Sequence, residues 1–278
     1  MWIALSIISA LALSVRDISI KKGATQGSSL FSSVAMLTLL LPITIGVIAW
    51  ERNFSFTFNL SLILISAALI DTLAIYFYSK SLRCGGNLST TAPLLAFIPV
   101  FQVGFSYVFL GEVTSIYGVL GVGLSIAFVL YGNSFSVNKI IEDNSSVYML
   151  GVSLCWGSSS LLHKQGASHF GALLWTSYVC LISFMILMSC ALMWDRSNIQ
   201  LKKMPKLWLP AMSHFITLAA FYGAAALGNV AYVSSIRRLS SVFSLIGSIA
   251  VFKERPSFKV LIMTAGLTFS AVIITVLG

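Results

Sequence analysis

The sequence has few charged residues. Charged side chains make up 9% of its 278 residues, against about 25% in an ordinary soluble domain. Hydrophobic residues make up 58%, and the mean hydropathy is +0.94. A chain of this composition cannot keep its apolar surface away from water. We therefore expect an all-α integral membrane protein, with lipid as its solvent.

The sequence also lacks the motifs of enzymes and of nucleic-acid-binding proteins. It contains no HExxH, no GxGxxG, no phosphate-binding loop with its lysine and no GxSxG elbow. Three of the four cysteines, Cys155, Cys180 and Cys190, lie in apolar runs without the spacing of a metal site. The basic loops do not alternate with aromatic residues, as nucleic-acid-binding surfaces do. We expect no enzyme activity, no cofactor, no metal and no nucleic-acid partner.

Hydropathy and helix breakers predict about ten membrane-spanning helices. Each needs about 20 mostly apolar residues, so ten helices and their short loops fill the chain. The predicted ranges are 2–20, 28–50, 59–80, 88–110, 113–132, 147–163, 171–194, 207–228, 230–252 and 257–277. Pro93 and Pro99 lie within range 88–110, where each removes a backbone donor and permits a kink.

The two halves of the chain resemble each other. Similar segments recur in the same order, 142 to 144 residues apart: Ile18–Ala24 with Leu161–Ala167, Trp50–Arg52 with Trp194–Arg196, and Phe109–Glu112 with Val251–Glu254. A polar connecting loop, 134–146, separates a first repeat, 1–133, from a second, 147–278. Because five helices are an odd number, the second repeat must be inverted relative to the first. Any shared cavity is then expected at the repeat interface, near the middle of the membrane.

The Lys and Arg residues are divided unequally between the two sides of the predicted membrane domain. Loops on the side of the termini hold two, Arg52 and Lys164. Loops on the opposite side hold eleven: Lys21, Lys22, Arg83, Lys139, Arg196, Lys202, Lys203, Lys206, Lys253, Arg255 and Lys259. Loops rich in Lys and Arg stay in the cytoplasm, so this asymmetry predicts that both termini lie outside.

Motifs at corresponding places in the two halves point to a family. They are Lys80-Ser81-Leu82, Ala92–Phe101 and Leu110-Gly111-Glu112 in the first half, and Tyr232–Ser240 and Phe252–Arg255 in the second. This arrangement resembles the drug/metabolite transporter superfamily, in its ten-helix branch with two EamA-type repeats. The resemblance implies alternating access through a cavity lined chiefly by helices 1, 3, 4, 6, 8 and 9. It also implies cytoplasmic termini, in conflict with the charge asymmetry.

Polar side chains within apolar spans are candidate functional residues, since a charge in mid-membrane costs about 2.5 to 3.5 kcal/mol and needs protein or water beside it. One face of the ninth predicted helix carries such residues at steps of three and four: Ser234, Arg237, Ser241, Ser244 and Ser248. Arg237 is predicted to bind an anionic group, with Arg238 supporting it or lining the entrance. The predicted substrate-binding residues are Arg237, Arg238, Ser241, Ser244, Gln102 and Tyr78. The alternative for the serines is close helix packing.

Three residues are candidates for proton coupling: Asp17, Asp71 and His214. Asp71 and His214 lie 143 residues apart, at equivalent places in the two repeats. The alternative for Asp17 is an ion pair with Lys21 or with an arginine of another helix, and for His214 a hydrogen-bonded packing role. Glu112 and Glu254, at the ends of the fourth and ninth predicted helices, are interpreted as caps or turn-holding groups.

Together these observations predict a secondary transporter, proton-coupled or facilitative, of a small polar metabolite such as an amino acid or organic anion. Its partners would be that substrate, with protons in the coupled case, and the lipid bilayer. We place it in the inner membrane of a bacterium, as a monomer or homodimer, with export one option for direction. Two alternatives remain: a membrane scaffold or partner subunit that transports nothing, and a lipid-moving protein.

Overall fold

The computed structural model describes residues 1–278 apart from 24–28, 84–91, 133–143, 195–206, 254 and 278. The described part is helical and contains no strand, which confirms the all-α class. The helices of the first half are α1 (Trp2–Gly23), α2 (Ser29–Glu51), α3 (Phe58–Arg83), the 3₁₀ helix η1 (Ala92–Phe97), α5 (Ile98–Leu110) and α6 (Ile116–Gly132). Those of the second half are α8 (Asn144–Phe170), α9 (Ala172–Trp194), α10 (Trp208–Leu227), α11 (Val230–Arg237), α12 (Ser240–Phe252) and α13 (Phe258–Val276).

The helices account for the ten expected membrane crossings. By length and composition, six of the described helices can span a membrane: α1, α2, α3, α9, α10 and α13. The apolar helices α5 and α6 are shorter, and α8 is more polar but has 27 residues, about 40 Å of helix. The short helices α11 and α12 together correspond to the ninth expected crossing.

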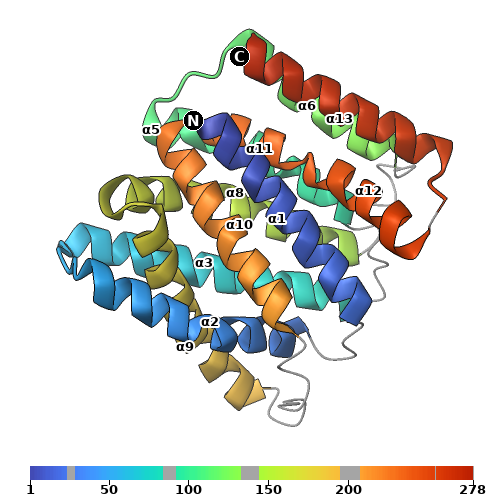
Figure 1. The fold of residues 1–278 in the computed structure, drawn as a ribbon. Helices are drawn as coiled ribbons and strands as arrows, with labels where there is room; N and C mark the ends of the chain where they lie inside the picture. The colour runs from blue at the N-terminus through green and yellow to red at the C-terminus, as the bar shows by residue number, and fades with distance from the viewer. Residues whose placement is uncertain (24–28, 84–91, 133–143, 195–206, 254, 278) are drawn as a thin grey trace.

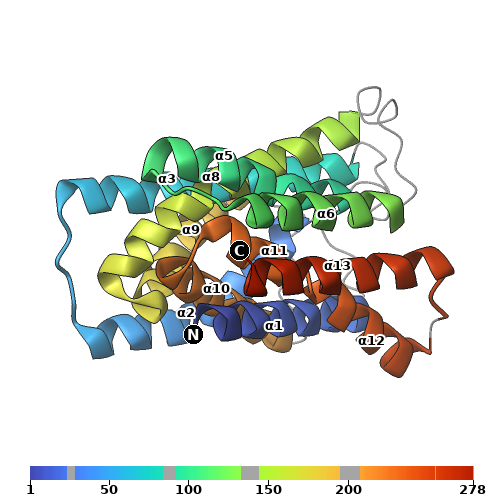
Figure 2. The same ribbon diagram turned by 90° about the horizontal axis from the view of Figure 1, so that it is seen from above.

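The helices pack in pairs that join the two halves. In Figure 1, α1 lies along α10, and α3 packs on α8; α2 packs on α9, and α6 on α13. Exchanging the two halves leaves this pattern unchanged, because the first helix of each half contacts the third helix of the other. Figure 2 shows the long helices running in a common direction, with both termini toward the same end of the bundle.

Two predicted helices are divided in the structure. The predicted range 88–110 is split into η1 and α5, with Pro99 in the first turn of α5, where its missing N–H group is tolerated. The predicted range 230–252 is split at Arg238 and Leu239, whose backbone N–H groups bond three residues back, to Ser235 and Ile236. The second division contains no proline, yet it lies 142 residues after the first.

The helix predicted over 147–163 extends to Phe170 and ends before Gly171, whose φ of 81° is left-handed. Lys164 was therefore wrongly assigned to a loop. Its ammonium group contacts the Glu112 carboxylate and donates to the Gly228 carbonyl at 2.7 Å. These contacts satisfy Lys164 within the helix, and they agree with a turn-holding role for Glu112. Glu254 lies outside the described residues.

Candidate functional site

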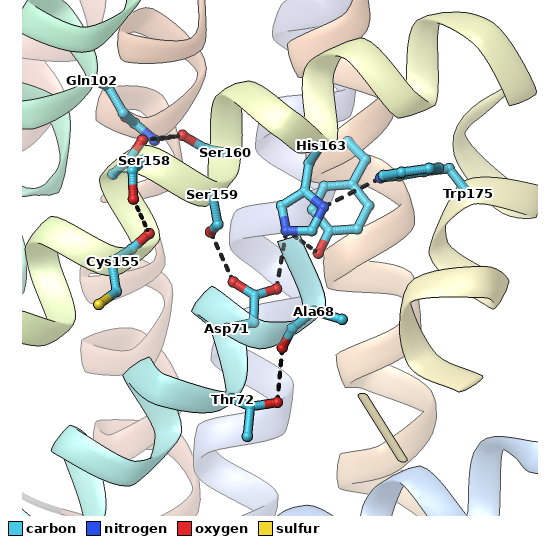
Figure 3. A network of polar contacts seen from close by, with 12 residues as sticks. Ala68, Asp71, Thr72, Gln102, Cys155, Ser158, Ser159, Ser160, His163 and Trp175 are labelled. Carbon is cyan, nitrogen blue, oxygen red and sulfur yellow. Dashed lines mark hydrogen bonds and ion pairs between the residues drawn. The ribbon is translucent and has the colours of Figure 1, made fainter. Parts of the chain in front are cut away.

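Asp71 of α3 lies at the centre of a polar network that reaches α8 (Figure 3). The Ser159 hydroxyl donates to Asp71 Oδ1 at 2.7 Å, and His163 Nε2 lies 2.9 Å from Asp71 Oδ2. The Asp71 side chain is 17% exposed and the His163 side chain 3%. Both carboxylate oxygens thus have a hydrogen-bond partner on the neighbouring helix.

Aromatic residues from two further helices hold His163 in place. Trp175 of α9 donates from its indole Nε1 to His163 Nδ1 at 3.2 Å. Tyr222 of α10 stacks on the imidazole, with ring centroids 4.1 Å apart and its hydroxyl 3.2 Å from Nε2. Trp175 and Tyr222 are both buried in the aromatic core that joins α8, α9 and α10. The imidazole therefore has a partner at each ring nitrogen and a ring across its face.

Small residues of α8 allow its neighbours to come this close. A Cβ on Gly166 would lie 2.2 Å from atoms of the Trp175 ring, so only glycine fits at this position. A Cβ on Gly157 would lie 2.7 Å from Cβ of Phe101 in α5. Serines 153, 159 and 160 add hydroxyl donors without bulk. The serine-rich and glycine-rich sequence of α8 thus explains why this helix contacts α3, α5 and α9.

Gln102, a predicted substrate ligand, lies beside this network. Its Nε2 donates to Ser160 Oγ at 2.8 Å, and the side chain is fully buried. Its Oε1 is also buried and has no hydrogen-bond partner among the described residues. Gln102 therefore joins α5 to α8, and it carries a free acceptor close to the Asp71 network.

A second polar contact joins α1 to α10. Arg16 donates to Asp17 Oδ1 from Nε at 3.0 Å and from a terminal nitrogen at 2.8 Å. The other terminal nitrogen lies 3.3 Å from His214 Nδ1. Asp17 thus pairs with its neighbour in sequence, a partner that neither sequence alternative named. The Asp17 side chain is 47% exposed, so it differs strongly in environment from Asp71.

The two arginines of the ninth crossing have different surroundings. The guanidinium carbon of Arg237 lies 4.7 Å from the ring centroid of Phe221, a cation–π contact. Its Nε is buried, and among the described residues no hydrogen bond or ion pair to the Arg237 side chain is present. Arg238 instead donates to the carbonyl of Leu95 in η1 at 2.7 Å. Arg238 therefore holds the two divided helices together, and Arg237 is the available cation.

The remaining predicted ligands are divided between two places. The break after α11 separates Ser234 and Arg237 from Ser241 and Ser244, which lie on α12 beside α1. Tyr78 of α3 packs near Trp156, with ring centroids 6.4 Å apart, and lies within electrostatic range of Arg16 and Asp17. The side chain of Ser248 lies outside the described residues.

Electrostatic interactions connect these contacts across the bundle. Arg237 interacts with the charges of Arg16, Asp17 and Asp71, and His214 interacts with both Arg16 and Arg237. The structure thus brings together Arg237, Asp17, Asp71 and His214, which are distant in sequence. It adds His163, Trp175 and Tyr222, which the sequence reasoning did not single out. The one available signal was a histidine next to an apolar run, but the predicted helix ended at His163.

The fold and these polar groups define a multi-pass membrane protein with ionisable residues inside its helical bundle. Residues 144–277 match the model of the EamA-like transporter family. This match covers the second half of the chain, and it confirms the resemblance to the drug/metabolite transporter superfamily. The match identifies a transporter of small molecules.

Comparison with solved structures supports the same fold over the whole chain. A crystal structure of a protein with 13% sequence identity superposes with a TM-score of 0.78, covering 99% of this chain and 98% of the other. At this identity the similarity concerns the fold alone. No curated protein matches the chain.

Proposed function

We propose that this protein is a secondary transporter, and not an enzyme, that moves a small anionic metabolite such as an organic anion or an amino acid across a bacterial inner membrane. Two inverted repeats, 1–133 and 147–278, would alternate in opening the central polar groups to either side. The observation that carries the proposal is the Arg237 guanidinium, which packs on Phe221 and has no carboxylate partner among the described residues.

The charges around Arg237 favour an anion. Arg237 lies within electrostatic range of two further guanidinium groups, Arg16 and Arg238, and of two carboxylates, Asp17 and Asp71. With neutral histidines the group carries one net positive charge, since three minus two is one. Desolvated charge inside a membrane protein is costly unless it is paired. A monoanionic carboxylate would neutralise the group, and the planar guanidinium binds a carboxylate through two parallel hydrogen bonds.

Protonation of Asp71 would couple to this binding. Uptake of one proton removes a negative charge and leaves the group with two net positive charges, so an anion binds more tightly. By linkage, a bound anion favours protonation of Asp71 to the same degree. Proton and anion that bind together would cross together. The proposed coupling is therefore co-transport in one direction.

Substitution of Arg237 tests the proposal. Purified protein is screened against metabolite pools by thermal shift, because a ligand that binds only the folded state raises its stability. Arg237→Gln should weaken binding of the anion found in this way by about 2 to 5 kcal/mol. Arg237→Lys should weaken it less, because the charge remains but the planar fork is lost.

Arg255→Gln serves as the matched control, because Arg255 is exposed in the loop before α13. It should bind the anion as the unsubstituted protein does. Unchanged binding and transport in Arg237→Gln would contradict the proposal, as would a screen in which only cations stabilise the protein.

A further inference from the structure

The contacts of His163 define which of its ring nitrogens carries a proton. An indole N–H can only donate, so the Trp175 contact at 3.2 Å requires Nδ1 to accept. In the neutral imidazole the proton is then on Nε2, which donates to Asp71 Oδ2 at 2.9 Å. An imidazolium would direct an Nδ1–H group against the indole N–H, with two donors facing each other. The stacked ring of Tyr222 and the depth of burial oppose a ring flip that would avoid this conflict.

We infer that Trp175 keeps His163 neutral, so that Asp71 alone takes up and releases the coupled proton and His163 acts as a positioning residue. This inference rests on the proposed function, which it deepens by assigning the group that changes charge. A histidine beside a carboxylate would otherwise be the natural proton carrier at neutral pH.

The groups around Asp71 have opposing effects on the charge of His163. The negative charge of Asp71 favours the imidazolium, whereas the Trp175 donor opposes it. Arg237 from α11 is a cation within electrostatic range of Asp71. The other titratable groups near Asp71, in α8, α9 and α10, are uncharged when protonated: Cys155, Cys180 and Tyr222. The Trp175 donor is therefore the contact that opposes the imidazolium.

The hydrogen-bond pattern also shows where Asp71 can accept the proton. Oδ2 receives the fixed Nε2–H of His163, and a proton there would conflict with it. Oδ1 receives the hydroxyl of Ser159, which can rotate and accept instead. A hydronium ion thus transfers its proton to Oδ1 and leaves as water. The Ser159 hydroxyl turns from donor to acceptor, so its hydrogen bond to Oδ1 is reversed, while the bond from His163 remains.

The protonation of His163 can be measured directly by nitrogen-15 NMR of the full chain in lipid nanodiscs. The chain has three histidines, so His163→Gln identifies the resonances of this residue. We expect neutral imidazole with Nε2–H between about pH 5 and pH 8. In Trp175→Phe the imidazolium should appear within that range. An imidazolium in the unsubstituted protein at about pH 6 would overturn the inference without touching the proposed anion transport.

Transport measured against pH separates this role from simple packing. In Trp175→Phe a positively charged His163 would favour ionised Asp71, so the pH of half-maximal transport should fall by about one unit. Trp208→Phe, on the exposed face of α10, should leave it unchanged.

In a His163→Gln background, Trp175→Phe should cause no further change, because no titratable ring remains. An equal shift in both backgrounds would show that Trp175 acts through packing and would overturn the inference. Transport that does not depend on pH in the unsubstituted protein would refute the proton coupling itself, while the NMR spectrum still decides the state of His163.

Discussion

The contact between α3 and α8 and the contact between α1 and α10 are the same contact in the two halves. Adding 143 to Asp71 gives His214, and adding 143 to Arg16 gives Ser159. The Ser159 hydroxyl lies 2.7 Å from Asp71 Oδ1, and a terminal nitrogen of Arg16 lies 3.3 Å from His214 Nδ1. One pair of backbone positions thus carries an acid facing a hydroxyl in one half and a histidine facing a cation in the other.

This difference indicates that the two contacts have different roles. In the α3–α8 contact, Asp71 receives neutral donors, so its carboxylate keeps a charge that a proton can remove. In the α1–α10 contact, Arg16 already pairs with Asp17, and its other terminal nitrogen directs a donor at His214 Nδ1. The first contact is suited to gaining and losing a proton, and the second is suited to holding a fixed charge.

The largest expected effect is on the pH dependence of transport, and it should differ between the equivalent residues Asp71 and His214. Asp71→Asn should abolish the pH dependence of transport, because an amide keeps the shape but cannot release a proton. His214→Asn, its counterpart in the other half, should retain that dependence. Uptake into proteoliposomes at a series of pH values measures both. Loss of pH dependence in His214→Asn alone would reverse the assignment of the two contacts.

Much of the fold could be predicted from the sequence, because lipid demands long apolar helices and proline marks one division. The division of the ninth helix could not, since Arg238 and Leu239 include no helix breaker. A tertiary contact lies at this division, the bond from Arg238 to the carbonyl of Leu95. A side chain that bonds to a distant backbone leaves no local pattern.

The candidate site was predictable only in part, for a related reason. Asp71 and Arg237 stand out in any apolar span, since charge is rare there. The partners of Asp71 do not, because serine and tryptophan are common in membrane helices and His163 adjoins the polar pair Lys164 and Gln165. The repeat offset aligns Asp71 with His214, but it does not say that α3 packs on α8. The pairing of helices had to be known first.

A smaller effect is expected from the hydroxyl that faces Asp71. Ser159→Ala would leave Oδ1 with one donor fewer in a largely buried place, at a cost of about 1 to 3 kcal/mol in the free energy of unfolding. The adjacent Ser158→Ala is a close control, because Ser158 donates only to the carbonyl of Cys155 in its own helix. Its cost should be below about 0.5 kcal/mol. Equal costs in reversible denaturation in detergent would show that Ser159 does not stabilise Asp71.

The smallest effect is expected at Asp17, although it is one of the two carboxylates near the centre. Its partner Arg16 precedes it in the chain, and its side chain is about half exposed, so the ion pair should contribute less than about 1 kcal/mol to stability. Because this charge is already balanced by Arg16, its removal should not change which group carries the proton. Asp17→Asn should therefore keep both the pH dependence of transport and nearly all of the stability. Arg16→Gln, which also removes the contact to His214, should destabilise the protein more. If instead Asp17→Asn lost the pH dependence and Asp71→Asn kept it, the coupling acid would lie in α1, and the two equivalent contacts would have the opposite roles.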